Sequence, residues 1–523
     1  MSRHVGAPVD MEKEGIIVKY KQYVLALACT VMTPFAASAM TSTNVPVDSV
    51  YYTYIDKLSG MGYIQSMPNG AKPYSRLEVA KWVLEAKDKA AEKPMPDYLA
   101  SQLDALEAYV APEIAMLQGD AAQNDVTLRD VTVEGTYNHT DALQYPYKSV
   151  HGSWQPFGAN RNGYRYGRDG SVSALMEISG NIGHDTAVSL RPRLGYTTDD
   201  KGTASLEEGY VKTRFGSLEV EAGRQAMIWG QGASGNLLLG NNMKPLTALQ
   251  VHLNEPKKVG GFMRFLGDVD FHSFYGILDG DRKADAASMG RTDFDDPGLL
   301  GLRVDITPTD YATFGISRIS LLGGKGNSLS RSDWGDWLTG TNAYTNDKWD
   351  DIGGFDFRLR FPGVQWYGEL YGEDQAGYLP SKIAYRLGAY FPRLTSDGMW
   401  DMTVEAAKTS DVWYRHGTFQ DGWTYSGDIM GDPMGTDALK YYGSVKRYLP
   451  YEGYLGAYYM RTEMERRTPG HPVVDEAALM GQQKVGDNVY LKGTLGLARV
   501  QNGAGSGQTD YAKFATAAFQ WRY

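Results

Sequence analysis

Apolar and polar positions alternate along the chain from about residue 126 onward, which is the period of a β-strand. The segment 210–224 is the clearest case, because Gly216-Ser217 supplies a two-residue hairpin turn. Folding about this turn places Val211 and Phe215 on one apolar face. The opposite face pairs Lys212 with Glu221, so both faces agree across the turn.

A second hairpin is predicted over 355–370, with its turn at Pro362-Gly363. Its apolar face is aromatic and aliphatic, and its polar face places Asp356 opposite Glu369. Two carboxylates side by side repel each other, so we expect a bridging arginine, either Arg358 or Arg360. A soluble sandwich and a membrane barrel both produce such two-faced hairpins.

The final strand favours the barrel. Phe519, Trp521 and Tyr523 alternate with polar residues, and Tyr523 is the recognition residue that we expect the outer-membrane assembly machinery to bind. About 395 residues, at roughly 20 to 24 per strand and connection, predict about 16–18 strands. The expected fold is thus an all-β, antiparallel transmembrane barrel over 123–523, surrounded by outer-membrane lipid and lipopolysaccharide.

Residues 45–118 instead show helical spacing, and we expect a small periplasmic α-helical head over 40–122. Asp48 is a candidate cap for the first helix. Ser75 and Glu78 have the spacing of a capping box at the start of the second helix. A third helix is expected to kink at Pro112.

The first 39 residues have the pattern of a signal peptide. Lys19 and Lys21 precede an apolar run, and Ala37-Ser38-Ala39 resembles a cleavage site. The only cysteine, Cys29, would leave with this segment. After this segment the sequence contains no run of about 18 apolar residues, so it predicts no membrane-spanning helix.

Composition narrows the function. The 523 residues contain 52 Lys and Arg against 62 Asp and Glu, a net charge of −10, which argues against a nucleic-acid partner. The histidines show no metal-ligand spacing and no nucleophile motif appears, so we expect no enzyme, metal or cofactor. The acidic segment 279–296 is interpreted as a surface loop bridged to lipopolysaccharide, with Ca²⁺ binding as the alternative.

Long segments between strands are rich in aromatic residues, and in a barrel of this kind the long loops face outward. Flat rings stack on the apolar faces of sugars, so the loops predict a polysaccharide site. The alternative is that the rings form the aromatic girdle at the membrane interface. The expected loops are 139–168, 226–258, 279–298, 323–351, 372–384, 411–440 and 464–487. The candidate sugar-binding residues are Trp334, Trp337, Trp349, Trp413, Trp423 and Tyr425.

Glycine-rich motifs recur in a fixed order along the predicted barrel. Their residues are Gly223, Arg224, Trp229, Gly230, Gly232, Asn236, Glu373 and Asp374. The ordered set resembles the Wzi family of capsule assembly proteins. The resemblance implies a barrel of about eighteen strands whose outward loops hold capsular polysaccharide on the cell surface.

The head, from 50 to 86, is similar to a surface-layer-homology module. That resemblance implies that Arg76 contacts an anionic wall polymer and tethers the barrel to peptidoglycan. The alternative is that Ser75 and Glu78 are simply a helix cap.

The polar residues of the predicted lumen can be interpreted in two ways. Its inferred charges have both signs, so they either line a pore or bond to one another and fill it. An open lumen would make the protein a porin or diffusion channel instead of a polysaccharide-binding barrel. The predicted lumen charges are Lys212, Arg214, Glu219, Glu221, Arg358 and Arg360.

Overall fold

The structure is a computed structural model that describes residues 40–65, 70–120, 124–199, 201–340, 348–376 and 379–523. The predicted signal peptide, 1–39, lies outside the described residues. Among the described helices, none is both long enough and apolar enough to cross a membrane.

Eighteen strands, counted over the described residues, form one closed antiparallel barrel, as predicted. Each strand pairs with the next along the chain, and β2 closes the barrel by pairing with both β5 and β25. The strands are β2 (Thr127–Thr140), β5 (Asp169–Ile182), β6 (Thr186–Thr197), β7 (Lys201–Phe215), β8 (Leu218–Gln225), β10 (Leu246–Leu253), β12 (Asp268–Ile277), β13 (Gly298–Thr309), β14 (Ala312–Leu322), β15 (Trp349–Phe361), β16 (Val364–Ala376), β17 (Leu379–Phe391), β18 (Trp400–Lys408), β21 (Leu439–Tyr448), β22 (Tyr454–Glu463), β23 (Val473–Lys484), β24 (Val489–Gln501) and β25 (Thr509–Arg522).

The registers of both predicted hairpins are confirmed. In β7–β8, Lys212 pairs with Glu221 across the turn. In β15–β16, Asp356 pairs with Glu369. The bridging arginine was wrongly predicted, because Arg303 of β13 provides the ion pair with Asp356, at 2.6 Å. The positive charge therefore comes from β13, which is separated from β15 by β14, and not from the strand of Asp356 itself.

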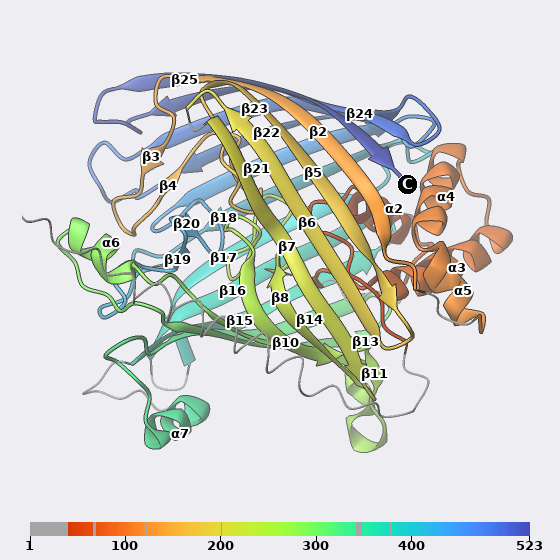
Figure 1. Ribbon diagram of the computed structural model, residues 1–523, viewed down its shortest axis with the longest axis horizontal. Helices are drawn as coiled ribbons and strands as arrows, with labels where there is room; N and C mark the ends of the chain where they lie inside the picture. The colour runs from red at the N-terminus through yellow and green to blue at the C-terminus, as the bar shows by residue number, and fades with distance from the viewer. Residues whose placement is uncertain (1–39, 66–69, 121–123, 200, 341–347, 377–378) are drawn as a thin grey trace, which may run out of the picture.

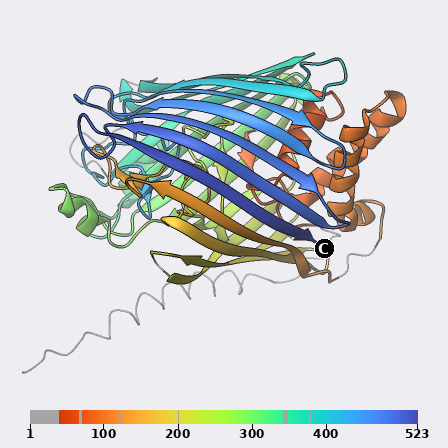
Figure 2. The ribbon, with the colours of Figure 1, turned by 90° about the horizontal axis from the view of Figure 1, so that it is seen from above.

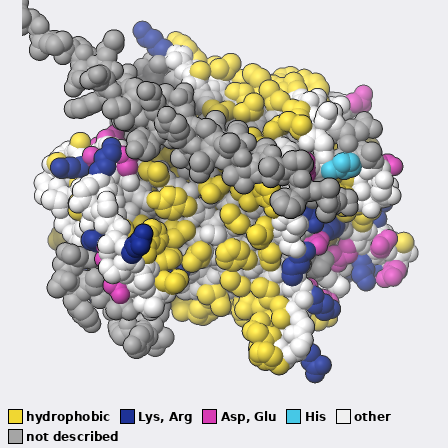
Figure 3. Space-filling model, turned by 60° about the horizontal axis from the view of Figure 1, so that its bottom comes forward, with side chains coloured by type: hydrophobic (Ala, Val, Ile, Leu, Met, Phe, Trp, Pro, Cys, Tyr) yellow, Lys and Arg dark blue, Asp and Glu magenta, His cyan; other side chains and the backbone are white. Residues whose placement is uncertain are grey.

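The outer face of the barrel is apolar. Val211 and Phe355 are about two-fifths exposed, whereas their charged neighbours Lys212 and Asp356 are fully buried in the interior. Figure 3 shows a broad apolar band between two ends that carry most of the charged side chains. This distribution matches a barrel with lipid outside and polar groups inside.

The two ends of the barrel differ (Figure 1). At the turn end, strands are joined by short turns such as 216–217, 310–311 and 362–363. The exception there is 254–267, which holds β11 (Lys257–Lys258) and the 3₁₀ helix η1 (Gly261–Leu266). At the loop end lie the long connections and their small elements β3 (Tyr145–Pro146), β4 (Ser153–Trp154), α6 (Arg282–Ser288), α7 (Arg331–Thr339), β19 (Thr424–Tyr425) and β20 (Asp428–Ile429). The short strand β9 (Ile228–Trp229) pairs instead with a strand of the head.

Three expected loops are shorter than predicted. The segment 226–258 contains strand β10, and 464–487 contains the whole of β23. The segment 372–384 is largely the paired ends of β16 and β17. Each of these stretches is rich in Gly or polar residues, which hides strand alternation where the inner face is polar.

The helical head packs at the turn end (Figures 1 and 2). Its described residues form β1 (Ala71–Lys72) and four helices, α2 (Tyr51–Gly60), α3 (Arg76–Glu92), α4 (Asp97–Tyr109) and α5 (Ala111–Leu117). The capping box of Ser75 and Glu78 is present. The expected third helix is two helices, because the chain breaks at Val110 ahead of Pro112. Asp48 does not cap α2; instead it pairs with Arg191 of the barrel at 2.9 Å.

Arg76 is fully buried inside the head. Its guanidinium pairs with Glu113 at 3.0 Å and lies over the ring of Tyr109, 4.3 Å from the centroid. A polymer outside the head has no access to this side chain. The prediction that Arg76 contacts a wall polymer is therefore wrong. Its side chain instead joins α3 to α4 and α5.

We predict that Arg76→Ala loosens the head, since it leaves Glu113 buried without its cation, a change that costs about 3–5 kcal/mol. Limited proteolysis should cut the head much faster than in the wild type. Lys87→Ala, which removes the exposed pair with Glu107, should leave digestion unchanged. Equal digestion of the Arg76→Ala variant and the wild type would contradict the role of the buried pair.

Candidate functional site: a plug and a cap at the loop end

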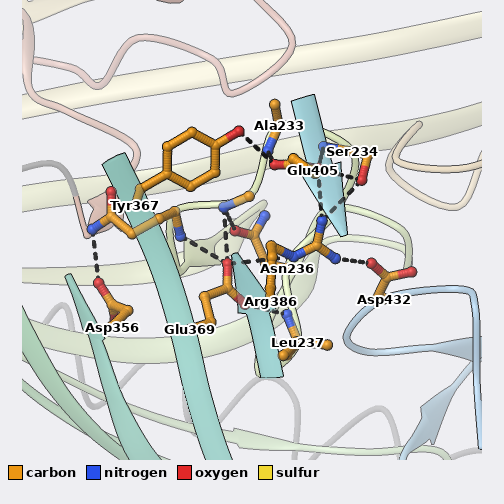
Figure 4. A network of polar contacts seen from close by, with 12 residues as sticks. Ala233, Ser234, Asn236, Leu237, Asp356, Tyr367, Glu369, Arg386, Glu405 and Asp432 are labelled. Atoms are coloured by element: carbon orange, nitrogen blue, oxygen red, sulfur yellow. Dashed lines mark hydrogen bonds and ion pairs between the residues drawn. The ribbon is translucent and has the colours of Figure 1, made fainter. Parts of the chain in front are cut away.

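The connection from β8 to β10, residues 226–245, folds into the lumen and is called the plug here. Its backbone amides are held by the carboxylate of Glu369 on β16 (Figure 4). The amides of Gln231 and Gly232 donate to Oε1 at 2.9 and 2.8 Å, and the amide of Leu237 donates to Oε2 at 2.7 Å. One buried carboxylate thus satisfies three amides that have left the barrel ladder.

A second carboxylate anchors the next residues of the plug. Glu405 of β18 accepts the amides of Ala233 and Ser234 at 2.5 and 3.0 Å. Arg386 of β17 bridges Glu405, at 2.8 Å, and Asp432 from the connection 409–438. Figure 4 shows Arg386 between these carboxylates, so wall, plug and outer connection share one network.

Asp432 stays ionised in this network. Burial on its own would raise the pKa of Asp432, but Lys440 and Arg386 hold the pKa below its usual value. Lys440 pairs with it at 2.6 Å and also donates to the carbonyl of Ser234 at 3.0 Å. The outer connection is therefore fixed to the plug by charge.

Two positions of the plug favour glycine, because a Cβ atom there would collide with neighbouring atoms. A Cβ at Gly232 would lie 1.9 Å from the carbonyl oxygen of Gly235 and would also meet Arg386. Gly230 has a φ of +141°, a conformation that favours glycine, and a Cβ there would crowd Glu369 and Asn236. The side chain of Asn236 in turn accepts the amide of Gly232 at 3.1 Å.

The predicted lumen charges mostly bond to chain segments inside the barrel. Lys212 pairs with Glu219 at 3.3 Å and donates to Asn44, and Asn44 donates to Glu221 at 2.8 Å. Arg358 donates to the side chain of Gln231 in the plug, at 3.0 Å. The remaining two are placed differently: Arg360 donates to Thr313 on the wall and Arg214 donates to the Met40 carbonyl.

The head also reaches the plug. Strand β1 pairs with β9, and the amide of Gly230 donates to the carbonyl of Gly70 at 2.9 Å. A polar cavity of about 910 Å³ is lined by head, plug and wall residues, including Tyr52, Asn236 and Lys492. The lumen is thus filled at the plug and hollow between the plug and the head.

Connections 141–168, 278–297 and 409–438 cover the plug and are called the cap. Trp413 and Trp423 are completely buried in it. The indole N–H of Trp423 donates to the carbonyl of Leu238 at 3.2 Å, and Tyr414 donates to the carbonyl of Leu237 at 2.6 Å. These rings and the plug leucines belong to one hydrophobic core.

Five of the six candidate sugar-binding aromatic residues are buried and offer no accessible ring to a sugar. Tyr425 is buried in the same core as Trp413, and Trp349 begins strand β15 with its ring buried against Trp337 and Leu322. Trp334 on α7 is the exception, since it is 41% exposed. Trp413, Trp423 and Tyr425 pack the cap, because apolar loop residues gain more by covering the plug than by facing water. Trp337 and Trp349 form a separate core with Leu322.

The remaining motif residues shape the barrel rim. Gly223 approaches the backbone of β7 so closely that a Cβ would lie 2.3 Å from the Gly209 carbonyl. Arg224 donates to the carbonyl of Leu206 at 3.0 Å. Glu373 accepts the amide of Tyr414 at 2.7 Å, which fixes the cap to β16. The side chain of Asp374 lies outside the described residues.

Sequence reasoning missed the residues that bind the plug from the wall and the cap, chiefly Arg386, Glu405 and Asp432. Glu405 and Arg386 sit on strands among alternating apolar residues, so their inward direction is readable from the pattern. Their partners are not, because Glu405 and Ser234 are separated by 171 positions.

Fold and site together define a class: a closed membrane β-barrel whose lumen is blocked by its own loop under a packed cap. Comparison of the sequence with protein families shows which family within that class the chain belongs to. The model of the capsule assembly protein Wzi family matches residues 139–512, so the chain belongs to this family and is an outer-membrane protein.

Two relatives agree with this assignment. A solved structure of *Escherichia coli* Wzi, described as an outer-membrane, carbohydrate-binding β-barrel involved in group 1 capsule assembly, covers 93% of this chain and 100% of its own, at 19% identity and a TM-score of 0.67. An uncharacterized 55.8 kDa protein in the cps region of *Klebsiella pneumoniae* is 28% identical over 181 residues. That match spans 33% of this chain and about a third (34%) of the relative.

OprD of *Pseudomonas aeruginosa* has a lower likeness. It covers 77% of this chain and 97% of its own at 12% identity, with a TM-score of 0.44. That score is too low to support an inference about function.

We predict that Glu369→Ala frees the plug, because three charge-assisted hydrogen bonds are lost at once, each worth roughly 1.5–3 kcal/mol. Hydrogen exchange of the amides from 229 to 240 should accelerate at least about 100-fold, which corresponds to roughly 3 kcal/mol. Glu463→Ala at the rim, where the carboxylate pairs with Arg461, is the control. Unchanged exchange in the Glu369→Ala variant would show that the plug is held by other contacts.

Proposed function

We propose that this protein binds and retains capsular or related surface polysaccharide on the cell exterior through its loop end. The observation that carries the proposal is the plug. Because Glu369 and Glu405 fix this loop across the lumen, the outer surface of the loop end, and not an open channel, is available for binding. Membership of the Wzi family and the carbohydrate-binding description of the *E. coli* structure support the same function.

The proposal orients the barrel with its loop end outside and its head in the periplasm. Long loops outside and short turns in the periplasm are the rule for barrels of this kind. Recognition of Tyr523 by the assembly machinery, contact with lipopolysaccharide and a peptidoglycan tether through the head remain predictions. A tether would need surface residues of the head, since Arg76 is buried.

Trp334 is the aromatic candidate with an accessible ring. It stands on α7, 5.8 Å from the ring of Trp337 and nearly perpendicular to it, so its position is fixed by a buried neighbour. Helix α7 begins with a capping box at Ser330 and Asp333 and leans on the barrel wall through the bond of Trp337 to Ser320. A rigid, exposed ring is suited to stack on a sugar.

We expect deletion of the gene to lower cell-bound polysaccharide and raise released polysaccharide, because synthesis continues while retention is lost. Separate measurement of the two fractions in culture checks this. A fall of both fractions together would point to a role in synthesis or export, and no change in either would exclude the capsule function.

Trp334→Ala should reduce polysaccharide retention several-fold while the barrel stays folded, since the ring lies outside every hydrophobic core. The matched control is Tyr451→Ala, which removes an exposed ring at the turn end. Retention assays in a deletion strain that carries each variant provide the measurement. Equal retention by both variants would exclude Trp334 as a sugar platform.

The competing function, a porin or diffusion channel, predicts steady ion conductance in a planar bilayer. We expect the wild type to show none, because the plug bonds to the wall at Glu369, Glu405 and Arg358. A double variant Glu369→Ala, Glu405→Ala should produce intermittent openings. Steady wild-type conductance would overturn the proposal that the lumen is closed.

A further inference from the structure

Three segments of the cap meet at one point of the loop end. His151 comes from the connection 141–168, Asp285 from helix α6 and Asp421 from the connection 409–438. The ligand atoms of these three side chains all lie within 4.8 Å of one another. The sequence gives no sign of this, because the residues are separated by more than 130 positions and lack any metal-ligand spacing.

The geometry suits a small cation. His151 Nδ1 lies 3.4 Å from Asp421 Oδ1 and 3.6 Å from Asp285 Oδ2. Two ligand atoms bound to one zinc ion at about 2.0–2.1 Å in tetrahedral geometry are separated by about 3.3–3.4 Å. The observed distances therefore need little adjustment to accept a cation.

Asp421 provides an independent indication of a ligand site. Its side chain is only 3% exposed, and Oδ1 makes no hydrogen bond with the part of the chain that the structure describes. Its other oxygen is occupied, because Oδ2 accepts from Thr424 at 3.0 Å and lies 3.4 Å from Arg282. A buried carboxylate oxygen without a donor is costly, and this one faces His151.

The surrounding charge also favours a divalent cation. Asp293 is buried behind the group, where its carboxylate pairs with Arg282 at 3.2 Å and accepts the amide of Asp421. Asp285, Asp293 and Asp421 together contribute three negative charges, and Arg282 contributes one positive charge. With His151 neutral, as a metal ligand is, the group has an excess of two negative charges.

We propose that His151, Asp285 and Asp421 bind a divalent transition-metal ion such as Zn²⁺, which joins the three segments of the cap. One imidazole and two carboxylates are the ligands of zinc-type ions, whereas Ca²⁺ takes six to eight oxygens. His151 and Asp285 are about one-third exposed, so the site opens toward solvent. The site is independent of the polysaccharide proposal.

The test uses the full chain in lipid nanodiscs, stripped with a chelator and titrated with Zn²⁺ alone in a calorimeter. We expect one saturable site per chain at micromolar affinity or tighter. His151→Ala should weaken binding by about tenfold or more, since one ligand of three is lost. Because His151 is partly exposed, this change should not unfold the cap.

His139→Ala is the matched control. His139 is also a loop-end histidine paired with an aspartate, Asp169 at 2.9 Å, but within the described part of the chain no second carboxylate completes a set of ligands there. Its variant should bind Zn²⁺ like the wild type. Asp421→Asn keeps the shape of the side chain and should weaken binding as His151→Ala does. Absence of saturable binding by the wild type, or equal binding by the His139 and His151 variants, would overturn the proposal.

Discussion

A carboxylate enclosed in a barrel needs partners, because water is excluded and an unpaired charge is costly there. In this protein the constraint is met by the chain itself. Glu369 and Glu405 face inward, and the plug supplies the amides that they accept. The charges that would make the lumen of a channel conductive are the ones that hold this lumen closed.

The cap depends on the same arrangement. Once the plug is fixed, Leu237, Leu238 and Leu239 present an apolar surface toward the loop end, and Trp413 and Trp423 cover it. A loop cluster that would otherwise move freely acquires a packed interior. Outward parts of the cap such as helix α6, whose Arg282 donates to the carbonyls of Thr424 and Gly422, are then held on a firm base, which lowers the entropy lost when a ligand is bound.

Much of the fold was predictable because it follows from alternation. The Lys212–Glu221 register, the capping box at Ser75 and the barrel itself need only local patterns. The site was less accessible to such reasoning. Arg303 replaces the expected bridging arginines because the inward side chains of β13 and β15 meet across the intervening strand β14. The sequence identifies the aromatic loop residues as binding candidates. Whether their rings are buried depends on a partner surface elsewhere in the chain, and for Trp413 and Trp423 the plug provides that surface.

The pairing of β2 with β25 joins the first and last strands of the barrel. The seam therefore forms only when the whole barrel sequence is present. The plug lies in the middle of the chain, and residues 41–44 also lie inside, where Thr41 and Asn44 bond to the wall. Threading both into a finished cylinder would mean stripping water from many charged groups in a confined space. We therefore expect the wall strands to fold around the plug and residues 41–44 while these are already in place. Pairing of β2 with β25 would then close the barrel and enclose both segments.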